Sequence, residues 1–474
     1  MLTPAPVDML FLHVPRWRDG RREIMVMPTG FTALANLMID EGRSCAISHL
    51  GIEREADPGF SLQALLASTR PRLVLLTLHW HGQTRGVIDT ARLIRKAMPR
   101  STIVVGGLTA SAFARDLVSA ISAIDGVVRG DGERPLQVLA RVVLDGVGSA
   151  RDVPNLVWRD GGTVVDNGLS WVLDEATAGG LRHGSLRALR LRERYMSRAL
   201  YADFSEGADG SEGYPLAAYL NAGRGCAAEC VHCGGASSAQ MLTSCRRGVL
   251  HYPVAKLLRD VREAVQEGAR ALRMSFDPPA ARRHLRAWFD AIVADGHRLR
   301  AIYDVWHLAS PSFVDLFSRT FEPGSMLIFS PECGNEQLRY RIRGLPFTNT
   351  QLLRSLADAE DRGLRTHCFF SAGLPSETPA QVEETARLIG QIRGTTRSGI
   401  SVCPMVLDPA SPLHVHPERY GVRLIRKTLR DYYEERGLPG GPGYETEHFD
   451  EQGILQACNR LLAAAGLSSL AGSA

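Results

Sequence analysis

The segment Cys226-Ala-Ala-Glu-Cys230-Val-His-Cys233 places three cysteines on one short stretch, with the spacing Cys-x3-Cys-x2-Cys. Three thiolates at this spacing can bind three irons of a 4Fe–4S cluster and leave the fourth iron without a protein ligand. Zinc, with His232 or a distant residue as the fourth ligand, is the alternative, but no second Cys/His pair lies at finger spacing. The other six cysteines are scattered singly, unlike a secreted disulfide framework: Cys45, Cys245, Cys333, Cys368, Cys403 and Cys458.

The cysteine segment lies near the start of a regular alternation of strand and helix signals. Six apolar segments are expected to be strands: 217–223, 271–276, 299–306, 326–332, 364–373 and 400–406. Helical patterns separate them, for example at 254–268 and 349–363. Six such steps predict a partial (β/α)6 barrel over 214–415, whose active site lies at the carboxyl ends of the strands. The cysteines follow the first strand and should therefore lie at this edge.

The N-terminal part shows a second alternation. Strands are expected at 9–14, 45–50, 71–78, 101–107 and 125–130, with helices between them, including one over 112–121. The continuous apolar run at 71–78 is typical of a strand buried on both faces. We therefore predict an α/β fold with a flavodoxin-like, Rossmann-type domain over 1–150. A linker over 151–213, with a hairpin at 154–167 and an Arg-rich helix, should connect it to the barrel, and 416–474 should form a small C-terminal extension.

Composition excludes several classes of protein. The chain has 474 residues, of which 45% are hydrophobic and 22% charged, an ordinary globular balance. The net charge of +4 is too small to indicate a nucleic-acid partner. The apolar run Leu73–Leu78 is too short to span a membrane, and the N-terminus shows no export signal. We therefore expect a cytoplasmic monomer with no nucleic-acid or membrane partner.

The cysteine spacing, together with the barrel, resembles the radical S-adenosylmethionine (SAM) enzymes. This resemblance implies a 4Fe–4S cluster on Cys226, Cys230 and Cys233, with SAM bound through its amino and carboxylate groups to the open iron. It also implies an external electron donor of the flavodoxin or ferredoxin type. Further SAM contacts are expected from segments after the strands: Gly234 and Gly235, Ser330 and Glu332, and Gly373 in Gly373-Leu-Pro-Ser-Glu-Thr378.

Each of these further segments also has an ordinary structural explanation. Gly234 and Gly235 could belong to a plain loop, and Glu332 could be a solvated acid at a strand end. The Gly373 segment could simply begin a helix, with Ser376 as its cap and Pro379 in its first turn.

A flavodoxin-like domain ahead of such a barrel resembles the cobalamin-binding subclass of these enzymes. The resemblance implies cobalamin contacts from segments that follow the strands. The candidates are Pro28, Gly30, His79, Trp80, His81, Gly106, Gly107, Thr109, Ser111, Gly130, Asp131, Gly132 and Glu133. No Asp-x-His-x-x-Gly motif occurs, so cobalt should lack a histidine ligand, with His79, Trp80 and His81 facing its lower side. The alternatives are that these three are ordinary buried or loop residues, or that cobalamin binding has been lost.

The resemblance implies a methyltransferase that modifies an unactivated carbon of a small molecule through methylcobalamin and a 5′-deoxyadenosyl radical. Leu78-His79-Trp80 and Cys233-Gly-Gly are also similar to sequences for pyrrole methylation in antibiotic biosynthesis. A radical cyclase or rearrangement enzyme of the same subclass, and a non-catalytic cobalamin or metal sensor, are the alternatives. Tyr432, Tyr433 and His448 from the C-terminal part are candidate substrate-pocket residues.

Overall fold

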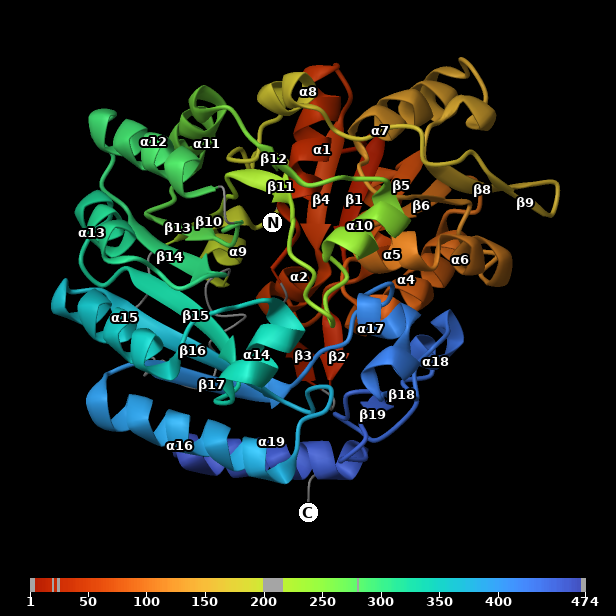
Figure 1. Ribbon diagram of the computed structural model, residues 1–474. Helices are drawn as coiled ribbons and strands as arrows, with labels where there is room; N and C mark the ends of the chain where they lie inside the picture. The colour runs from red at the N-terminus through yellow and green to blue at the C-terminus, as the bar shows by residue number, and fades with distance from the viewer. Residues whose placement is uncertain (1–4, 19–20, 24–25, 199–215, 279–280, 470–474) are drawn as a thin grey trace. The chain divides into compact units, whose positions relative to one another are not determined.

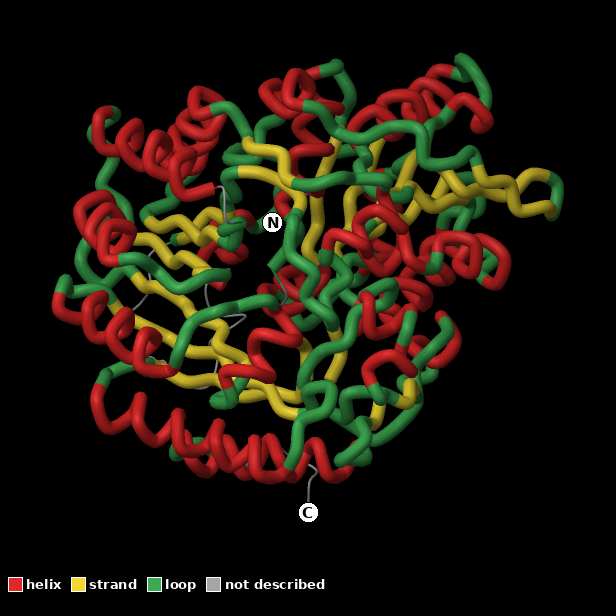
Figure 2. Tube along the Cα trace, in the orientation of Figure 1, coloured by secondary structure: helices red, strands yellow, loops and turns green. Residues whose placement is uncertain are grey.

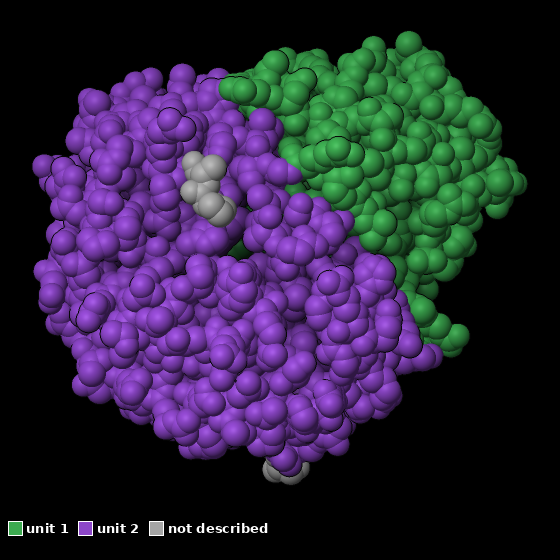
Figure 3. Space-filling model, viewed as in Figure 1, with its two compact units in different colours: residues 1–202, 240–247, 428–434 green, residues 203–239, 248–427, 435–474 purple. Residues whose placement is uncertain are grey.

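The computed structural model describes residues 5–18, 21–23, 26–198, 216–278 and 281–469. The chain forms two compact units, which Figure 3 colours separately. Unit 1 contains residues 1–202, 240–247 and 428–434, and unit 2 contains residues 203–239, 248–427 and 435–474. Two short segments from the later part of the chain therefore complete the N-terminal unit.

Unit 1 is built on a seven-stranded sheet with the order β4-β1-β5-β6-β7-β8-β9. Its strands are β1 (Met9–His13), β4 (Cys45–His49), β5 (Leu73–Thr77), β6 (Thr102–Gly106), β7 (Gly126–Val128), β8 (Leu156–Asp160) and β9 (Thr163–Asp166). The first five are parallel in the flavodoxin-like order, which confirms the predicted fold. The predicted hairpin is β8–β9, and it extends the sheet antiparallel to β7.

The helices of unit 1 cover this sheet (Figures 1 and 2). They are α1 (Thr29–Asp40), α2 (Leu50–Ala56), α3 (Leu62–Thr69), α4 (Thr84–Ala97), α5 (Leu108–Ala112), α6 (Ala114–Ala120), α7 (Glu133–Ala140), α8 (Glu175–Gly180), α9 (Arg192–Arg198) and α18 (Leu429–Tyr433). Every residue of β5 is buried, as its apolar run predicted. The helix expected over 112–121 is confirmed as α6, and α5 is an additional short helix that ends at Ala112, before the break at Phe113.

Unit 2 contains an all-parallel sheet whose strand order follows the chain, β10-β13-β14-β15-β16-β17. These strands are β10 (Ala217–Tyr219), β13 (Ala271–Met274), β14 (Arg300–Val305), β15 (Met326–Glu332), β16 (Arg365–Ala372) and β17 (Gly399–Pro404). No pairing joins β17 to β10 within the described ranges, so the barrel is open. All six predicted strands are present, which confirms the partial (β/α)6 architecture.

Helices lie along the outer side of the unit 2 sheet (Figure 1). They are α11 (Val254–Gln266), α12 (Ala281–Ala294), α13 (Pro311–Thr320), α15 (Asn349–Asp361), α16 (Pro379–Thr395) and α19 (Glu451–Ala465), with α14 (Glu336–Arg343) and α17 (Pro412–Val415) on connecting segments. Most of α10 (Ser237–Ser244) belongs to unit 1. Short antiparallel pairs complete the chain: β2 (Arg16–Arg18) with β3 (Arg21–Glu23), β11 (Gly223–Gly225) with β12 (Val249–His251), and β18 (Arg423–Leu424) with β19 (Tyr444–Glu445).

The start of α16 illustrates how local sequence fixes an element. Thr378 caps the helix and exchanges hydrogen bonds with Gln381, while Pro379 occupies the first turn. The expectation that Ser376 is the cap is therefore wrong, although the helix start itself is confirmed. In the part of the chain that the structure describes, no helix combines the length and apolar character needed to cross a membrane.

Candidate active site

The cysteine loop runs from β11 to α10 in unit 2, and three backbone hydrogen bonds hold it in place. The Val231 amide donates to the Ile342 carbonyl at 3.0 Å, and the Val231 carbonyl accepts from the Leu413 amide at 2.8 Å. The His232 carbonyl accepts from the Asp408 amide at 3.0 Å. Ile342 follows β15 in the chain, and both Asp408 and Leu413 follow β17. The loop is thus anchored to segments that leave the carboxyl ends of the barrel strands.

The three sulfur atoms each have a nearby polar or charged group. Cys226 Sγ accepts from the Ala228 amide and Cys233 Sγ from the Gly235 amide, both at 3.3 Å. The Cys230 side chain interacts electrostatically with the Arg343 guanidinium. Burial raises the pKa of the Cys226 thiol and raises the pKa of Cys233 to about 12. Loading of a metal must therefore remove protons from buried thiols, since thiolate is the ligand form.

Within the described ranges, no group of three or more His, Cys, Asp or Glu side chains is arranged to hold a single metal ion. The zinc alternative, with three cysteines and His232 around one ion, gains no support from this arrangement. A cubane cluster does not require one point of convergence, because each of its thiolates binds a different iron. Three sulfurs on one anchored loop, two of them accepting backbone N–H groups, suit that kind of cofactor.

Glu332 lies beside this loop in a strained, paired environment. Its backbone φ is 62°, where β15 departs from regular register with β16. One carboxylate oxygen accepts from Arg343 at 2.7 Å and the other from Ser371 at 2.8 Å. Arg343 also donates to the Ser330 carbonyl at 2.9 Å. Glu332 is therefore a buried, ion-paired residue and not a solvated acid. Its contact with SAM, and that of Ser330, remain predictions.

The expected Gly-Gly segment is packed tightly against the protein itself. The Gly234 amide donates to Asp408 Oδ2 at 3.0 Å, and a Cβ on Gly234 would meet Asp408 Cβ at 3.0 Å. Burial raises the pKa of Asp408 to about 6. The Gly235 amide is already bonded to Cys233 Sγ. Because both amides already have protein partners, any contact with SAM would come from other atoms of this segment. That contact stays a prediction.

Gly373 belongs to a turn that is also closed by protein groups. Its φ is 82°, and its amide donates to Glu377 Oε2 at 2.8 Å. Its carbonyl accepts from the Tyr444 hydroxyl at 2.9 Å. Glu377 is completely buried, and burial raises its pKa to about 7. Its second oxygen, Oε1, has no hydrogen-bond partner. Gly373 therefore has a structural requirement for glycine whether or not SAM lies beside it.

In unit 1, the residues expected to contact cobalamin tie together the loops that follow β5, β6 and β7. Thr109 Oγ1 donates to the His79 carbonyl at 3.0 Å, and Ser111 Oγ donates to the Gly107 carbonyl at 2.8 Å. Ser111 Oγ also accepts from the Gly130 amide at 3.0 Å. These two hydroxyls therefore already bond backbone groups of the loops. Their contact with cobalamin remains a prediction.

Asp131 and the residues around it are similarly engaged. Asp131 pairs with Arg246 and accepts from the Leu173 amide at 2.9 Å. Gly132 caps α7, whose first residue is the buried Glu133. Pro28 caps α1, and Gly30 lies in the first turn of that helix. The predicted residues thus line the carboxyl edge of the sheet at the starts of α1, α5 and α7.

Aromatic rings gather at the same edge of the sheet. The His13 ring lies 4.6 Å from the His49 ring and 6.3 Å from Trp80, measured between centroids, and His79 lies 4.7 Å from Trp80. His13 is completely buried, and neither ring nitrogen has a hydrogen-bond partner. Burial lowers the pKa of His13 well below its usual range, and lowers the pKa of His79 to about 4. Both imidazoles are therefore neutral near pH 7.

Three residues that the sequence analysis missed shape these sites. Buried Gln83 accepts from the His79 and Trp80 amides and donates to the Val14 carbonyl, so it fixes the loop after β5. In unit 2, Arg343 and Asp408 contact the cysteine loop. Arg343 and Asp408 lie far from the cysteines in sequence and belong to no recognisable motif, so only the fold identifies them.

Two of the substrate-pocket candidates lie in unit 1, and their role in a pocket stays a prediction. Tyr432 is buried in the unit 1 core, with its ring 5.2 Å from His81 and 5.6 Å from Phe113. The Tyr433 hydroxyl donates to Asp89 at 3.0 Å. His448 lies on the segment before α19, and its role stays a prediction.

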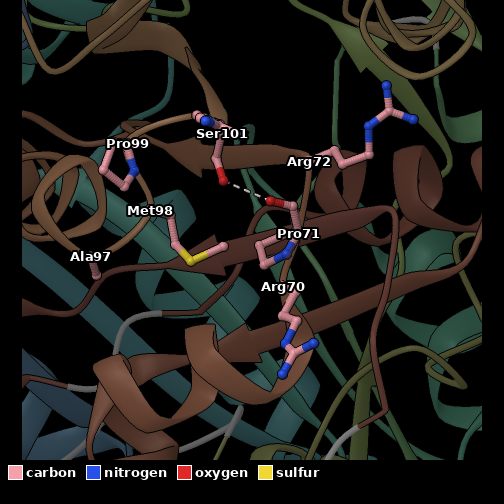
Figure 4. Close-up of a pocket in the computed structure, with 8 residues that line it drawn as sticks. Arg70, Pro71, Arg72, Ala97, Met98, Pro99 and Ser101 are labelled. Carbon is pink, nitrogen blue, oxygen red and sulfur yellow. Dashed lines mark hydrogen bonds between the residues drawn. The ribbon is translucent and has the colours of Figure 1, made fainter.

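A surface pocket in unit 1, shown in Figure 4, lies at the opposite edge of the sheet. It is lined by residues that precede β5 and β6, namely Arg70, Pro71, Arg72, Ala97, Met98, Pro99, Arg100 and Ser101. Ligands of doubly wound sheets bind at the carboxyl ends of the strands. This pocket is therefore not the cofactor site.

Two family models match the chain. The B12 binding domain matches residues 23–140, and the Radical SAM superfamily matches residues 220–389. This pair of domains places the chain in the cobalamin-dependent radical SAM enzyme family, and it confirms the expected cofactor classes: cobalamin, an iron–sulfur cluster and SAM. No curated protein matches the sequence.

Solved structures share the fold over nearly the whole chain. The radical SAM methyltransferase TsrM from Kitasatospora setae, with cobalamin and a [4Fe-4S] cluster bound, has a TM-score of 0.69 at 16% identity, covering 98% of this chain and 92% of that one. TsrM with tryptophan substrate and aza-SAM bound has a TM-score of 0.68 at 18% identity, covering 94% and 84%. OxsB, a cobalamin-dependent SAM radical enzyme with aqua-cobalamin and SAM bound, has a TM-score of 0.66 at 12% identity, covering 95% and 66%.

Proposed function

We propose that this protein is a cobalamin-dependent radical SAM methyltransferase that methylates an unactivated carbon of a small molecule in specialised metabolism, such as antibiotic biosynthesis. The observation that carries the proposal is the anchored three-cysteine loop at the carboxyl edge of an open six-stranded barrel, in a chain that also contains a B12-binding domain. TsrM, which shares this fold, is described as a methyltransferase, and that description supports methyl transfer as the proposed reaction.

Cys226, Cys230 and Cys233 would hold the cluster. Two of their sulfurs accept backbone amides, and Arg343 places a positive charge near Cys230, which suits sulfur that carries negative charge. Around SAM we place Gly234, Gly235, Ser330, Glu332 and Gly373. When bound, these cofactors supply the methyl group and the radical that removes hydrogen from carbon. The chain's task is to bind them, orient the substrate and exclude water.

For cobalamin, we place Pro28, Gly30, His79, Trp80, His81, Gly106, Gly107, Thr109, Ser111, Gly130, Asp131, Gly132 and Glu133 at the corrin edge. The fully buried, unpartnered imidazole of His13 lies next to Trp80 at the same edge. Buried polar groups without partners are rare in proteins and need an explanation. A ligand with hydrogen-bonding groups at this edge supplies one.

The test is product analysis under anaerobic conditions. Purified protein, reconstituted with iron, sulfide and hydroxocobalamin, is incubated with a strong reductant, methyl-deuterated SAM and candidate substrates, beginning with tryptophan and pyrrole carboxylates. We expect a product that carries the labelled methyl group, and none from the Cys226/Cys230/Cys233→Ala variant. SAM consumption with a changed substrate of unaltered carbon count would instead indicate a cyclase or rearrangement enzyme. Cofactor binding without SAM consumption across the panel would indicate a sensor.

Three further features belong to the same proposal. An external one-electron donor of the flavodoxin or ferredoxin type reduces the enzyme, because no second redox centre is indicated by the cysteine pattern. The protein acts as a monomer, and it acts in the cytoplasm. Size-exclusion chromatography with light scattering tests whether the protein is a monomer. Fractionation of the source cells tests whether it is in the cytoplasm.

A further inference from the structure

We propose that Arg343 sets the reduction potential of the cluster by placing a buried positive charge beside the cysteine loop. Glu332 limits this effect by partly neutralising the arginine. Arg343 is therefore a positioning and electrostatic residue and not a ligand. The inference rests on the proposed function, because it requires a cluster on the three cysteines.

The contacts of Arg343 define a short polar chain. Its guanidinium donates to Glu332 Oε1 at 2.7 Å and to the Ser330 carbonyl at 2.9 Å, and it interacts electrostatically with the Cys230 and Cys233 side chains. The far oxygen of Glu332 accepts from Ser371 at 2.8 Å. The Arg343 and Glu332 side chains are only 12% and 10% exposed, so solvent screens them weakly. A charge in this position acts on the sulfur through a medium of low dielectric.

Helix α14 holds Arg343 in this place. One turn earlier, the fully buried Arg339 donates to the carbonyls of Pro331, Cys333 and Phe347 and to Asn349 Oδ1, at 2.6–3.0 Å. At the end of the same helix, the Ile342 carbonyl accepts the Val231 amide of the cysteine loop. This backbone hydrogen bond fixes the helix end, and with it Arg343, beside the cysteine loop.

The expected effect follows from the charge change on reduction. One electron passes from the external reductant to the cluster, whose charge becomes one unit more negative, and no bond or proton changes. A cation near the ligating sulfurs stabilises the more negative state, since opposite charges attract strongly in a weakly screened site. Removing Arg343 must therefore lower the potential, while removing the charge of Glu332 must raise it.

The experiment is a redox titration of the reconstituted full-length protein without SAM, followed by electron paramagnetic resonance. We expect Arg343→Met to reduce the equilibrium constant for one-electron reduction at least tenfold, which corresponds to 59 mV. Arg343→Lys, which keeps the charge, should shift it less. Glu332→Gln should shift it in the opposite direction. Arg341→Met, which removes an exposed arginine from the same helix, is the matched control and should leave it unchanged.

Opposite shifts in the two variants cannot come from a general loss of structure. If Arg343→Met fails to assemble a cluster, the Arg343→Lys and Glu332→Gln shifts decide the question. An unchanged potential in Arg343→Met with full iron content, or a downward shift in Glu332→Gln, would overturn the inference and leave the proposed function standing. A wild-type chain that takes up no four-iron cluster would overturn both.

Discussion

Two adjacent glycines, Gly106 and Gly107, allow the cobalamin proposal to be separated from the stability of the fold. Gly107 has a φ of 120°, and a Cβ on it would lie 2.5 Å from the Leu78 carbonyl oxygen and 2.9 Å from the His79 nitrogen. A Cβ on Gly106 would meet nothing closer than the Val128 carbonyl, at 3.8 Å, and its φ is not in the left-handed region. The two positions therefore respond differently to the same substitution.

The magnitudes follow from these contacts. In Gly107→Val, a left-handed backbone costs ~1–2 kcal/mol, and forced overlap in a packed region costs roughly 1–3 kcal/mol more. The free energy of unfolding of unit 1 should therefore fall by about 2–5 kcal/mol. In Gly106→Val, the added Cβ makes only ordinary van der Waals contact, and valine suits a strand position. The free energy of unfolding should therefore change by no more than about 0.5 kcal/mol. If the corrin covers the carboxyl end of β6, Gly106→Val still loses cobalamin, because the side chain occupies its place.

Binding is measured by the absorbance change of hydroxocobalamin on addition to the full-length apo-protein, and stability by urea unfolding followed by circular dichroism. Gly106→Ala provides a smaller intrusion and should weaken binding less than Gly106→Val. Tight binding by Gly106→Val would refute the placement of the corrin at β6. A Gly107→Val protein as stable as the wild type would refute the packing argument.

Three other predictions concern single groups. Bound cob(II)alamin should show no nitrogen superhyperfine splitting in its electron paramagnetic resonance spectrum, and a three-line splitting that vanished in His13→Ala, His79→Ala or His81→Ala would identify an axial histidine instead. Burial raises the pKa of Glu377 from 4.5 to about 7, so the wild-type protein loses stability as pH rises through that range. In urea unfolding, the free energy of unfolding of Glu377→Gln relative to wild type should therefore increase by about 3 kcal/mol between about pH 5 and about pH 8.5. A difference between the two proteins that does not change with pH would refute this. Thr378→Ala should reduce the free energy of unfolding by about 1 kcal/mol through loss of the α16 cap, whereas Ser376→Ala, which removes no cap, should change it less.

The pattern of apolar residues, together with the turn-forming residues between segments, is sufficient to predict most of the strands. The strands of both sheets carry continuous apolar runs because parallel sheets are buried on both faces, and this signal is local in sequence. The cysteine loop was also predictable, because its three candidate ligands lie within one short stretch. Local patterns missed the short helix α5, and they offered Ser376 as the cap of α16, where the cap is Thr378.

The contacts that complete the sites were not predictable because they join distant parts of the chain. Arg343 reaches Cys230, Asp408 reaches Gly234, and Tyr432 reaches the core of unit 1. Glycines posed a different difficulty. Gly107 and Gly234 were expected to leave room for ligands, but their nearest neighbours are protein atoms. A glycine signals close approach of some group, and sequence alone does not say which.

The central claim is that Cys226, Cys230 and Cys233 together hold a four-iron cluster. It is tested most directly by iron and acid-labile sulfide analysis of anaerobically reconstituted protein, in parallel with the Cys226/Cys230/Cys233→Ala variant. Cys245→Ala, which removes an exposed cysteine outside the loop, is the control. We predict about four irons and four sulfides per chain for the wild type and the control, and almost none for the triple variant. Zinc in place of iron, or full iron content in the triple variant, would contradict the account.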